Sequence, residues 1–100
     1  MDKREIINIV KKYVNSISNI VQPDKIYLYG SYSKGNATKD SDIDVAFVYD
    51  EFKGNYVKTL GDLYFKTIDI DPRIEPVIVE RKKDPSGFIY DIEKTGIEIN

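Results

Sequence analysis

Apolar side chains in the first quarter of the chain recur every three or four residues, a spacing that predicts an amphipathic helix. Asp2 followed by Glu5 fits a capping box at its start, and Pro23 marks its end. The apolar side of this predicted helix consists of Ile6, Val10, Tyr13, Ile17 and Val21. These residues are therefore candidates for the core.

Two short apolar runs in the middle of the chain predict β-strands. Residues 25–29 are rich in aromatic and aliphatic side chains and stop at Gly30. Residues 43–49 begin with alternation, which would place Ile43, Val45 and Phe47 on one face. Between the two runs, residues 31–35 fit a single helical turn and residues 36–41 fit a polar loop.

The second half of the chain predicts a further helix, strand, helix and short strand. Residues 56–68 suit a helix, and its expected apolar stripe is Val57, Leu60, Tyr64 and Ile68. Residues 74–79 suit a strand, which Pro76 restricts to a sheet edge or a bulge. Ser86 is expected to introduce a last helix over residues 88–94, which Gly96 closes before a short strand over residues 97–99. This order indicates an α+β fold in which helices pack on a small mixed sheet.

Composition narrows the possible chemistry. The 100 residues suit one domain spanning 1–100, and the formal net charge of −2 disfavours long nucleic acids as partners. Histidine and cysteine are both absent, which leaves carboxylates, hydroxyls, amines and backbone groups for catalysis. Carboxylates suit hard cations such as Mg²⁺ or Mn²⁺. No apolar run reaches about 20 residues and no secretory signal is recognisable, so we expect a cytoplasmic location and no membrane partner.

The junction after the first predicted strand has the features of a phosphate-binding turn. Gly30 would let a ligand approach the backbone closely, and the free N–H groups of the following turn favour an anion. Ser31 adds a hydroxyl donor and Lys34 a positive charge. Taken alone, a Gly-Ser pair in this position is more often an ordinary turn.

Three carboxylates are candidates for a cation site. Asp42 and Asp44 are two residues apart at the start of the second predicted strand and would point to the same side. Glu75 interrupts the apolar third strand and would join them if that strand lies beside the second. Two divalent ions could then bind, with Glu75 able to assist as base. The structural alternatives are a solvated strand entrance for the pair and a solvent-facing position for Glu75; Asp69, Asp71 and Glu80 compete as third acid.

The order of these groups resembles the DNA polymerase β-like nucleotidyltransferase superfamily, and within it the minimal nucleotidyltransferases. The matching positions are Gly30, Ser31, Gly35, Ser41, Asp42 and Asp44. The resemblance covers residues 25–99. It implies that Gly30 and Ser31 bind the triphosphate, near Lys34 and Ser41, and that Asp42, Asp44 and Glu75 are catalytic and hold two Mg²⁺ ions. Many relatives carry aspartate at the third position, so Glu75 departs from the usual pattern.

The resemblance also implies a biological role. Such proteins transfer a nucleoside monophosphate, with ATP as the expected donor, and many act as antitoxins on a small helical partner of the HEPN type, some by adenylylating a tyrosine of that toxin. Two alternatives remain at this point: a binding module that neutralises its partner by contact, and a small-molecule nucleotidyltransferase. A homo-oligomer is also compatible with the sequence.

Other polar and aromatic residues have more ordinary expected roles. Tyr13 and Tyr64 fit apolar stripes and are expected in the core. Tyr32 is a weaker candidate for lining the site. The basic run 81–83 is expected to be a solvated loop, with phosphate or acceptor contact as the less favoured alternative.

Overall fold

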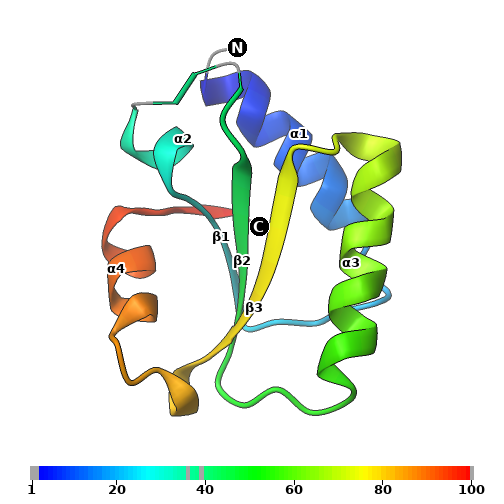
Figure 1. Cartoon of the computed structure of the whole chain (residues 1–100), viewed down its shortest axis with the longest axis vertical. Coiled ribbons are helices and arrows are strands. Elements are labelled where there is room, and N and C mark those ends of the chain that lie inside the picture. Colours follow the sequence, from blue (N-terminus) through cyan, green and yellow to red (C-terminus); the bar gives the residue numbers. More distant parts are fainter. Residues whose placement is uncertain (1–2, 36, 39, 100) are drawn as a thin grey trace.

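A computed structural model describes residues 3–35, 37–38 and 40–99. The chain runs through α1 (Lys3–Ser16), β1 (Lys25–Tyr29), α2 (Ser31–Lys34), β2 (Ile43–Tyr49), α3 (Tyr56–Ile70), β3 (Ile74–Glu80), the 3-10 helix η1 (Arg81–Lys83), α4 (Phe88–Thr95) and β4 (Ile97–Ile99). The expected α+β class with a small mixed sheet is confirmed (Figure 1). The cap predicted at Asp2 lies outside the described residues.

The four strands form one sheet in the order β3-β2-β1-β4. β1 is antiparallel to both β2 and β4, whereas β2 and β3 are parallel and are joined through α3. Parallel neighbours need such a crossover, because the end of the first strand and the start of the second lie at opposite ends of the sheet. β3 lies at the edge of the sheet, as Pro76 predicted.

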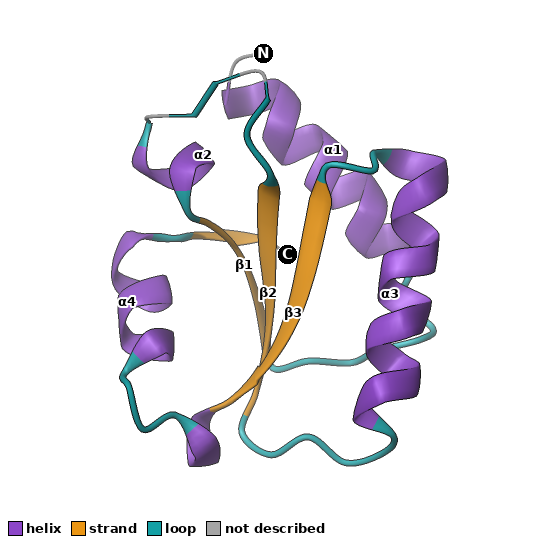
Figure 2. Ribbon diagram, in the orientation of Figure 1, coloured by secondary structure: helices purple, strands orange, loops and turns teal. Residues whose placement is uncertain are grey.

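The main core lies between one face of the sheet and helices α1 and α3 (Figure 2). Ile43, Val45 and Phe47 share that face, as their alternation predicted. The opposite face of β2 is partly covered by α4, which packs Ile89 and Ile92 against the sheet. β2 is therefore buried on both sides along most of its length, and its first residues lie at the uncovered end.

α1 ends earlier than the apolar pattern indicates. The predicted helix reached Val21, but regular helix stops at Ser16, and residues 17–20 form turns. The Ser16 hydroxyl donates to the carbonyl of Tyr13 at 2.6 Å, and the Ser18 hydroxyl donates to that of Asn15 at 3.1 Å. Such local bonds compete with the helical ladder. Val21 is still buried, because the turns keep it on the core side.

The predicted apolar stripe of α3 holds only for Leu60, which packs against the core, and is wrong for its other members. Leu63 and Thr67 face the core, whereas Val57 and Ile68 are 79% and 68% exposed. α3 carries apolar side chains on two of its sides, and the spacing alone does not identify the side that meets the sheet. One apolar side of α3 is consequently left on the surface.

The segment after β3 also differs from the prediction. Residues 81–83 form η1 rather than a solvated loop, and Arg81 pairs with Asp50 at 3.1 Å and with Glu93 at 3.6 Å. α4 begins at Phe88, whose N–H donates to Asp84 Oδ1 at 2.9 Å, so Asp84 rather than Ser86 caps it. No helix in the described part of the chain is long and apolar enough to cross a membrane.

Candidate active site

Three polar side chains form a row across neighbouring strands. Tyr29 on β1 lies opposite Asp44 on β2, and Asp44 lies opposite Glu75 on β3. Residues directly opposite one another point to the same face of a sheet. This face is the one that α4 only partly covers. Together with Tyr64, Pro76 and Val77, the row lines a cavity of about 260 Å³.

The row concentrates negative charge at Asp44. Burial raises the pKa of the Asp44 carboxyl to about 6, and the charges of Glu75 and then Asp42, together with a hydrogen bond to Glu75, add to this effect. Burial, and then the charges of Asp44 and Glu75, also raise the pKa of the Tyr29 phenol. The phenol therefore stays neutral, and a cation would relieve the repulsion between the carboxylates.

Asp42 lies beside this pair rather than within it. It precedes the first residue of β2 and is exposed, yet its charge contributes to the raised pKa of Asp44. No group of three or more acidic residues in the described ranges is arranged around a common metal position. The predicted convergence of three carboxylates is thus present for Asp44 and Glu75, with Asp42 as a near neighbour.

Gly30 brings the backbone against Asp44. Its φ of 75° and ψ of −147° lie in a region that favours glycine, and a Cβ added there would collide with Asp44 Oδ2. The next residues form α2, in which Lys34 N–H donates to the Gly30 carbonyl at 3.1 Å. Within the described part of the chain, the Ser31 hydroxyl has no hydrogen-bond partner. Gly30 therefore lets the Asp44 carboxylate approach the backbone closely, and Ser31 adds a hydroxyl donor one residue further along.

The other two predicted nucleotide contacts lie farther from the row. Lys34 is exposed at the end of α2 and does not line the cavity. Ser41 Oγ accepts from the Thr38 N–H at 2.9 Å and so shapes the turn before β2.

The competing acids are engaged elsewhere or lie on another element. Asp71 binds Arg73 at 2.7 Å, and this hydrogen bond lowers the pKa of the Asp71 carboxyl. Glu80, at the far end of β3, accepts from the Phe52 N–H at 3.1 Å. Asp69 is exposed on α3. Among these acids, Glu75 is the one in register with Asp44.

The tyrosines are distributed differently from the expectation. Tyr13 is fully buried, as predicted, but Tyr64 is 43% exposed and lines the cavity. Tyr32 belongs to the core, and its hydroxyl donates to the Thr38 carbonyl at 3.2 Å. The sequence reasoning overlooked Tyr29, although alternation along 25–29 and its position next to Gly30 would have placed it beside the site.

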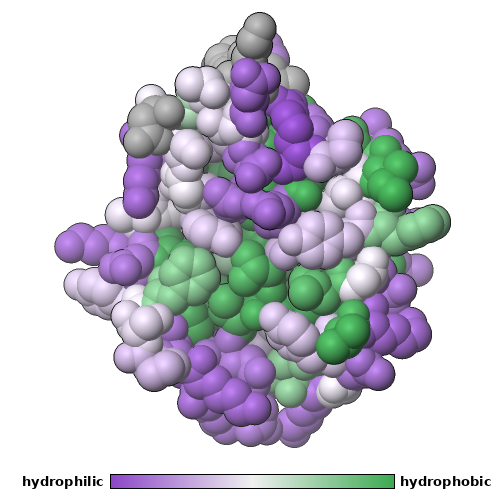
Figure 3. All heavy atoms as spheres, viewed as in Figure 1, coloured by the Kyte–Doolittle hydropathy of each residue, from purple (hydrophilic) through white to green (hydrophobic). Residues whose placement is uncertain are grey.

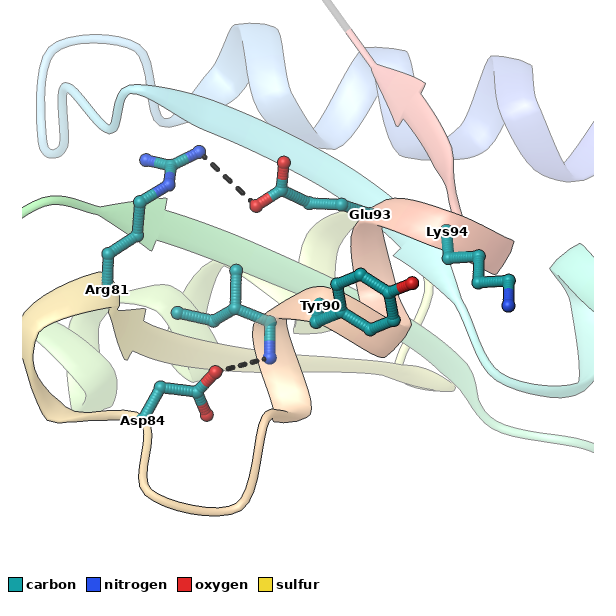
Figure 4. A pocket seen from close by; sticks show the side chains of 6 residues that line it. Arg81, Asp84, Tyr90, Glu93 and Lys94 are labelled. Carbon is teal, nitrogen blue, oxygen red and sulfur yellow. Dashed lines mark hydrogen bonds and ion pairs between the residues drawn. The ribbon is translucent and has the colours of Figure 1, made fainter.

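A larger hollow of about 510 Å³ lies against α4 (Figure 4). Its charged groups are already occupied. Arg81 pairs with Glu93 at 3.6 Å, Asp84 accepts from the first N–H groups of α4, and Lys94 Nζ lies 5.9 Å from the centre of the Tyr90 ring. Size alone therefore does not mark the functional site, and the smaller acidic cavity is the candidate.

The fold and the acidic row define a nucleotidyltransferase domain. The family described as "Polymerase beta, Nucleotidyltransferase" matches residues 4–100, and the chain belongs to it. Over 102 residues, it is 32% identical to a Methanocaldococcus jannaschii protein named as a protein adenylyltransferase, covering 95% of this chain and 99% of that relative. The resemblance seen in the sequence is therefore confirmed for the family.

Two solved structures share the fold. One, described as a nucleotidyltransferase from Sulfolobus solfataricus, has a TM-score of 0.64 at 18% identity and covers 96% of this chain and 80% of its own. The other comes from a toxin–antitoxin structure with AMP-PNP; its TM-score is 0.68 at 24% identity, with 94% and 72% covered. At these identities the likeness supports the architecture alone.

Proposed function

We propose that this protein transfers AMP from ATP to a hydroxyl group of an acceptor protein. The observation that carries the proposal is the alignment of Asp44 and Glu75 on adjacent strands, directly beside the glycine turn at Gly30. The relative named as a protein adenylyltransferase supports AMP and a protein acceptor as the specific choice.

Asp44 and Glu75, with Asp42 as a near neighbour, are the residues that would bind divalent cations, and bound ions would have to draw Asp42 towards the other two. Asp44 and Glu75 share one cavity. Burial first and the charge of Glu75 second raise the pKa of Asp44, and a cation would offset the repulsion between the two carboxylates. Oxygen ligands of this kind favour Mg²⁺. Asp42, Asp44 and Glu75 would hold the ions, which would neutralise the phosphates and polarise the α-phosphate. Gly30 and Ser31 would contact the triphosphate, with Lys34 and Ser41 at its outer side.

The proposed reaction is a displacement at the α-phosphorus of ATP. The acceptor oxygen forms a bond to this phosphorus, while the bond to the oxygen bridging towards the β-phosphorus breaks and pyrophosphate leaves. The acceptor proton passes to the Glu75 carboxylate, which is exposed and therefore accessible. Tyr29, which lines the cavity beside Asp44, would orient the incoming acceptor.

The proposed acceptor is a HEPN-type helical toxin, modified on a tyrosine, with this chain as its cytoplasmic antitoxin. A chain from a toxin–antitoxin structure has the same fold, and our proposal extends that setting to this chain.

Transfer of radiolabel from ATP tests the chemistry. The protein is incubated with Mg²⁺, α-labelled ATP and a co-expressed helical partner, beside Asp44→Asn and the matched control Asp69→Asn. We expect Asp44→Asn to lower the rate at least about 100-fold, because it removes a carboxylate that would hold the cations at the reacting phosphate, and Asp69→Asn to leave it unchanged. Equal labelling by wild type and Asp44→Asn would contradict the mechanism.

The same variants separate catalysis from neutralisation by contact. If Asp44→Asn still binds and silences the partner as well as wild type does, the role is that of a binding module. Labelling of an aminoglycoside in place of the protein would instead identify a small-molecule enzyme. The proposed function predicts neither result.

A further inference from the structure

One side of α3 exposes apolar side chains that the fold does not use. Val57, Phe65 and Ile68 are 79%, 69% and 68% exposed, and Tyr64 lies beside them. Their spacing of three and four residues places them on one side of the helix. We call this set, with Gly61 at its centre, the α3 stripe. Figure 3 shows apolar side chains gathered over the sheet between α4 and α3 and along α3 itself.

Gly61 has no evident role within the chain. It lies in the interior of α3, where glycine costs about 1 kcal/mol relative to alanine. A Cβ added at Gly61 would meet nothing within 4 Å, and Gly61 is not among the glycines with positive φ. Among the residues that the structure describes, neither packing nor backbone conformation therefore requires glycine here. Its remaining physical effect is to let another surface approach the helix backbone closely.

We propose that the α3 stripe binds the α3 stripe of a second copy, in an antiparallel pair that crosses at Gly61. The stripe is self-complementary about this point. Val57 and Phe65 lie four residues before and after Gly61, so each would meet the other across a two-fold axis. Absence of a Cβ at the crossing lets the two helices approach to the short end of the usual interaxial range, about 8 Å.

The charges beside the stripe suit the same arrangement. Lys58 and Asp62 form an ion pair at 2.9 Å on one flank of α3. In an antiparallel pair this flank meets its own copy, which brings Lys58 of each chain next to Asp62 of the other. Opposite charges therefore meet across the axis, although exposed pairs of this kind contribute little affinity and mainly favour this orientation.

The available area sets the expected strength. The exposed parts of Val57, Tyr64, Phe65 and Ile68 amount to about 500 Å² per chain, so the pair would bury at most about 1,000 Å². This total is at the low end for specific interfaces, and a dissociation constant of the order of tens of micromolar is expected. The inference does not rest on the proposed enzymatic activity.

Sedimentation equilibrium from about 1 to about 500 µM tests the pair in solution. Wild type should shift from monomer to dimer across this range. Phe65→Ser should weaken the dimer at least about tenfold, whereas the matched control Tyr90→Ser, which removes an equally exposed aromatic from α4, should not. Gly61→Arg should abolish the dimer while leaving the thermal stability of the monomer unchanged or higher, because arginine favours the helix.

Cross-linking tests the position of the axis. The chain has no cysteine, so one introduced thiol reports a single contact. Gly61→Cys should form a covalent dimer on mild oxidation, because residues at the crossing come within disulfide range, and Tyr90→Cys should do so much more slowly. A wild type that stays monomeric throughout, or equal cross-linking of the two variants, would overturn the proposal.

Discussion

Asp44 is partly buried and has two acidic neighbours, so its ionised form lowers the free energy of unfolding. The pKa of its carboxyl rises from 3.8 to about 6, so the folded protein holds this proton more tightly than the unfolded chain. Stability attributable to Asp44 is therefore present at low pH, falls as pH rises from about 4 to about 6, and stays reduced above that.

Asp44→Asn should consequently be more stable than wild type at neutral pH. We expect an advantage of about 1 to 2 kcal/mol in the free energy of unfolding, after allowance for solvent screening. The difference should be near zero at pH 4 and should grow towards pH 6, as measured by urea denaturation of both proteins. Comparing the two cancels the contributions of other carboxyls, such as Asp71. A difference that does not vary with pH would contradict the assignment.

Gly30 should be intolerant of any side chain, for two separable reasons. Gly30→Ala strains a positive φ and also drives its Cβ into Asp44 Oδ2. Gly35→Ala is the matched control, because Gly35 has a similar φ of 81° but nothing within 4 Å of an added Cβ. We expect a loss of about 1 kcal/mol for Gly35→Ala and about 3 kcal/mol for Gly30→Ala, with nucleotide transfer lost only in Gly30→Ala. Equal losses in thermal denaturation would show that the contact with Asp44 is unimportant.

At the level of elements, α4 depends on a cap that lies outside the helix. The Asp84 carboxylate accepts from the N–H groups of Phe88 and Ile89, both at 2.9 Å. Asp84→Ala should therefore lower the free energy of unfolding by about 1 kcal/mol, whereas Ser86→Ala, at the start expected from the sequence, should have almost no effect. Similar losses of unfolding free energy in the two variants, measured by chemical denaturation, would show that Asp84 is not the main cap of α4.

The strands were more predictable than the helices, and the reason is physical. β1 and β2 have the predicted bounds, because Gly30 ends the first and alternation sets the phase of the second. Helix α3 was placed within two residues at its end, but its buried side was wrong. A period of 3.6 residues shows which sides of a helix are apolar, but it does not show which of them is buried. In α3 the side that packs on β3 carries Leu63, so Leu63 is buried and Val57 is exposed.

The candidate site shows the same division between local and long-range information. Gly30, Ser31 and Asp44 lie within one short stretch of sequence, and the resemblance to a known family associated them, because the glycine turn and the acid pair are each ordinary when taken alone. The position of Glu75 beside Asp44 depends on β3 pairing in parallel with β2, which local pattern does not determine. Tyr64 reaches the cavity only because α3 lies along the edge strand, which is why its spacing suggested the core instead.

At the scale of the whole molecule, ligand binding should report how the site is charged. The triphosphate is strongly negative, and the cavity already holds the two carboxylates Asp44 and Glu75, so the nucleotide should bind only when a divalent cation is present. A non-hydrolysable ATP analogue at about 100 times its dissociation constant, with Mg²⁺, should stabilise the fold by about 2.7 kcal/mol. For a chain of this size, that corresponds to a rise in melting temperature of roughly 10 °C or more.

The controls for this shift use the same two carboxylates. The analogue with EDTA should give almost no change in melting temperature, because repulsion from Asp44 and Glu75 is then uncompensated. With Mg²⁺ present, Asp44→Asn should start from a higher melting temperature and gain much less from the analogue, because one cation ligand is missing. Without the analogue Asp44→Asn should therefore melt at the higher temperature, and with it wild type should. This change of order distinguishes a metal-dependent site from general stabilisation by an anion. An equal shift with EDTA would mean that the backbone at Gly30 and Ser31 binds the triphosphate without a cation, and that the acidic row has another role.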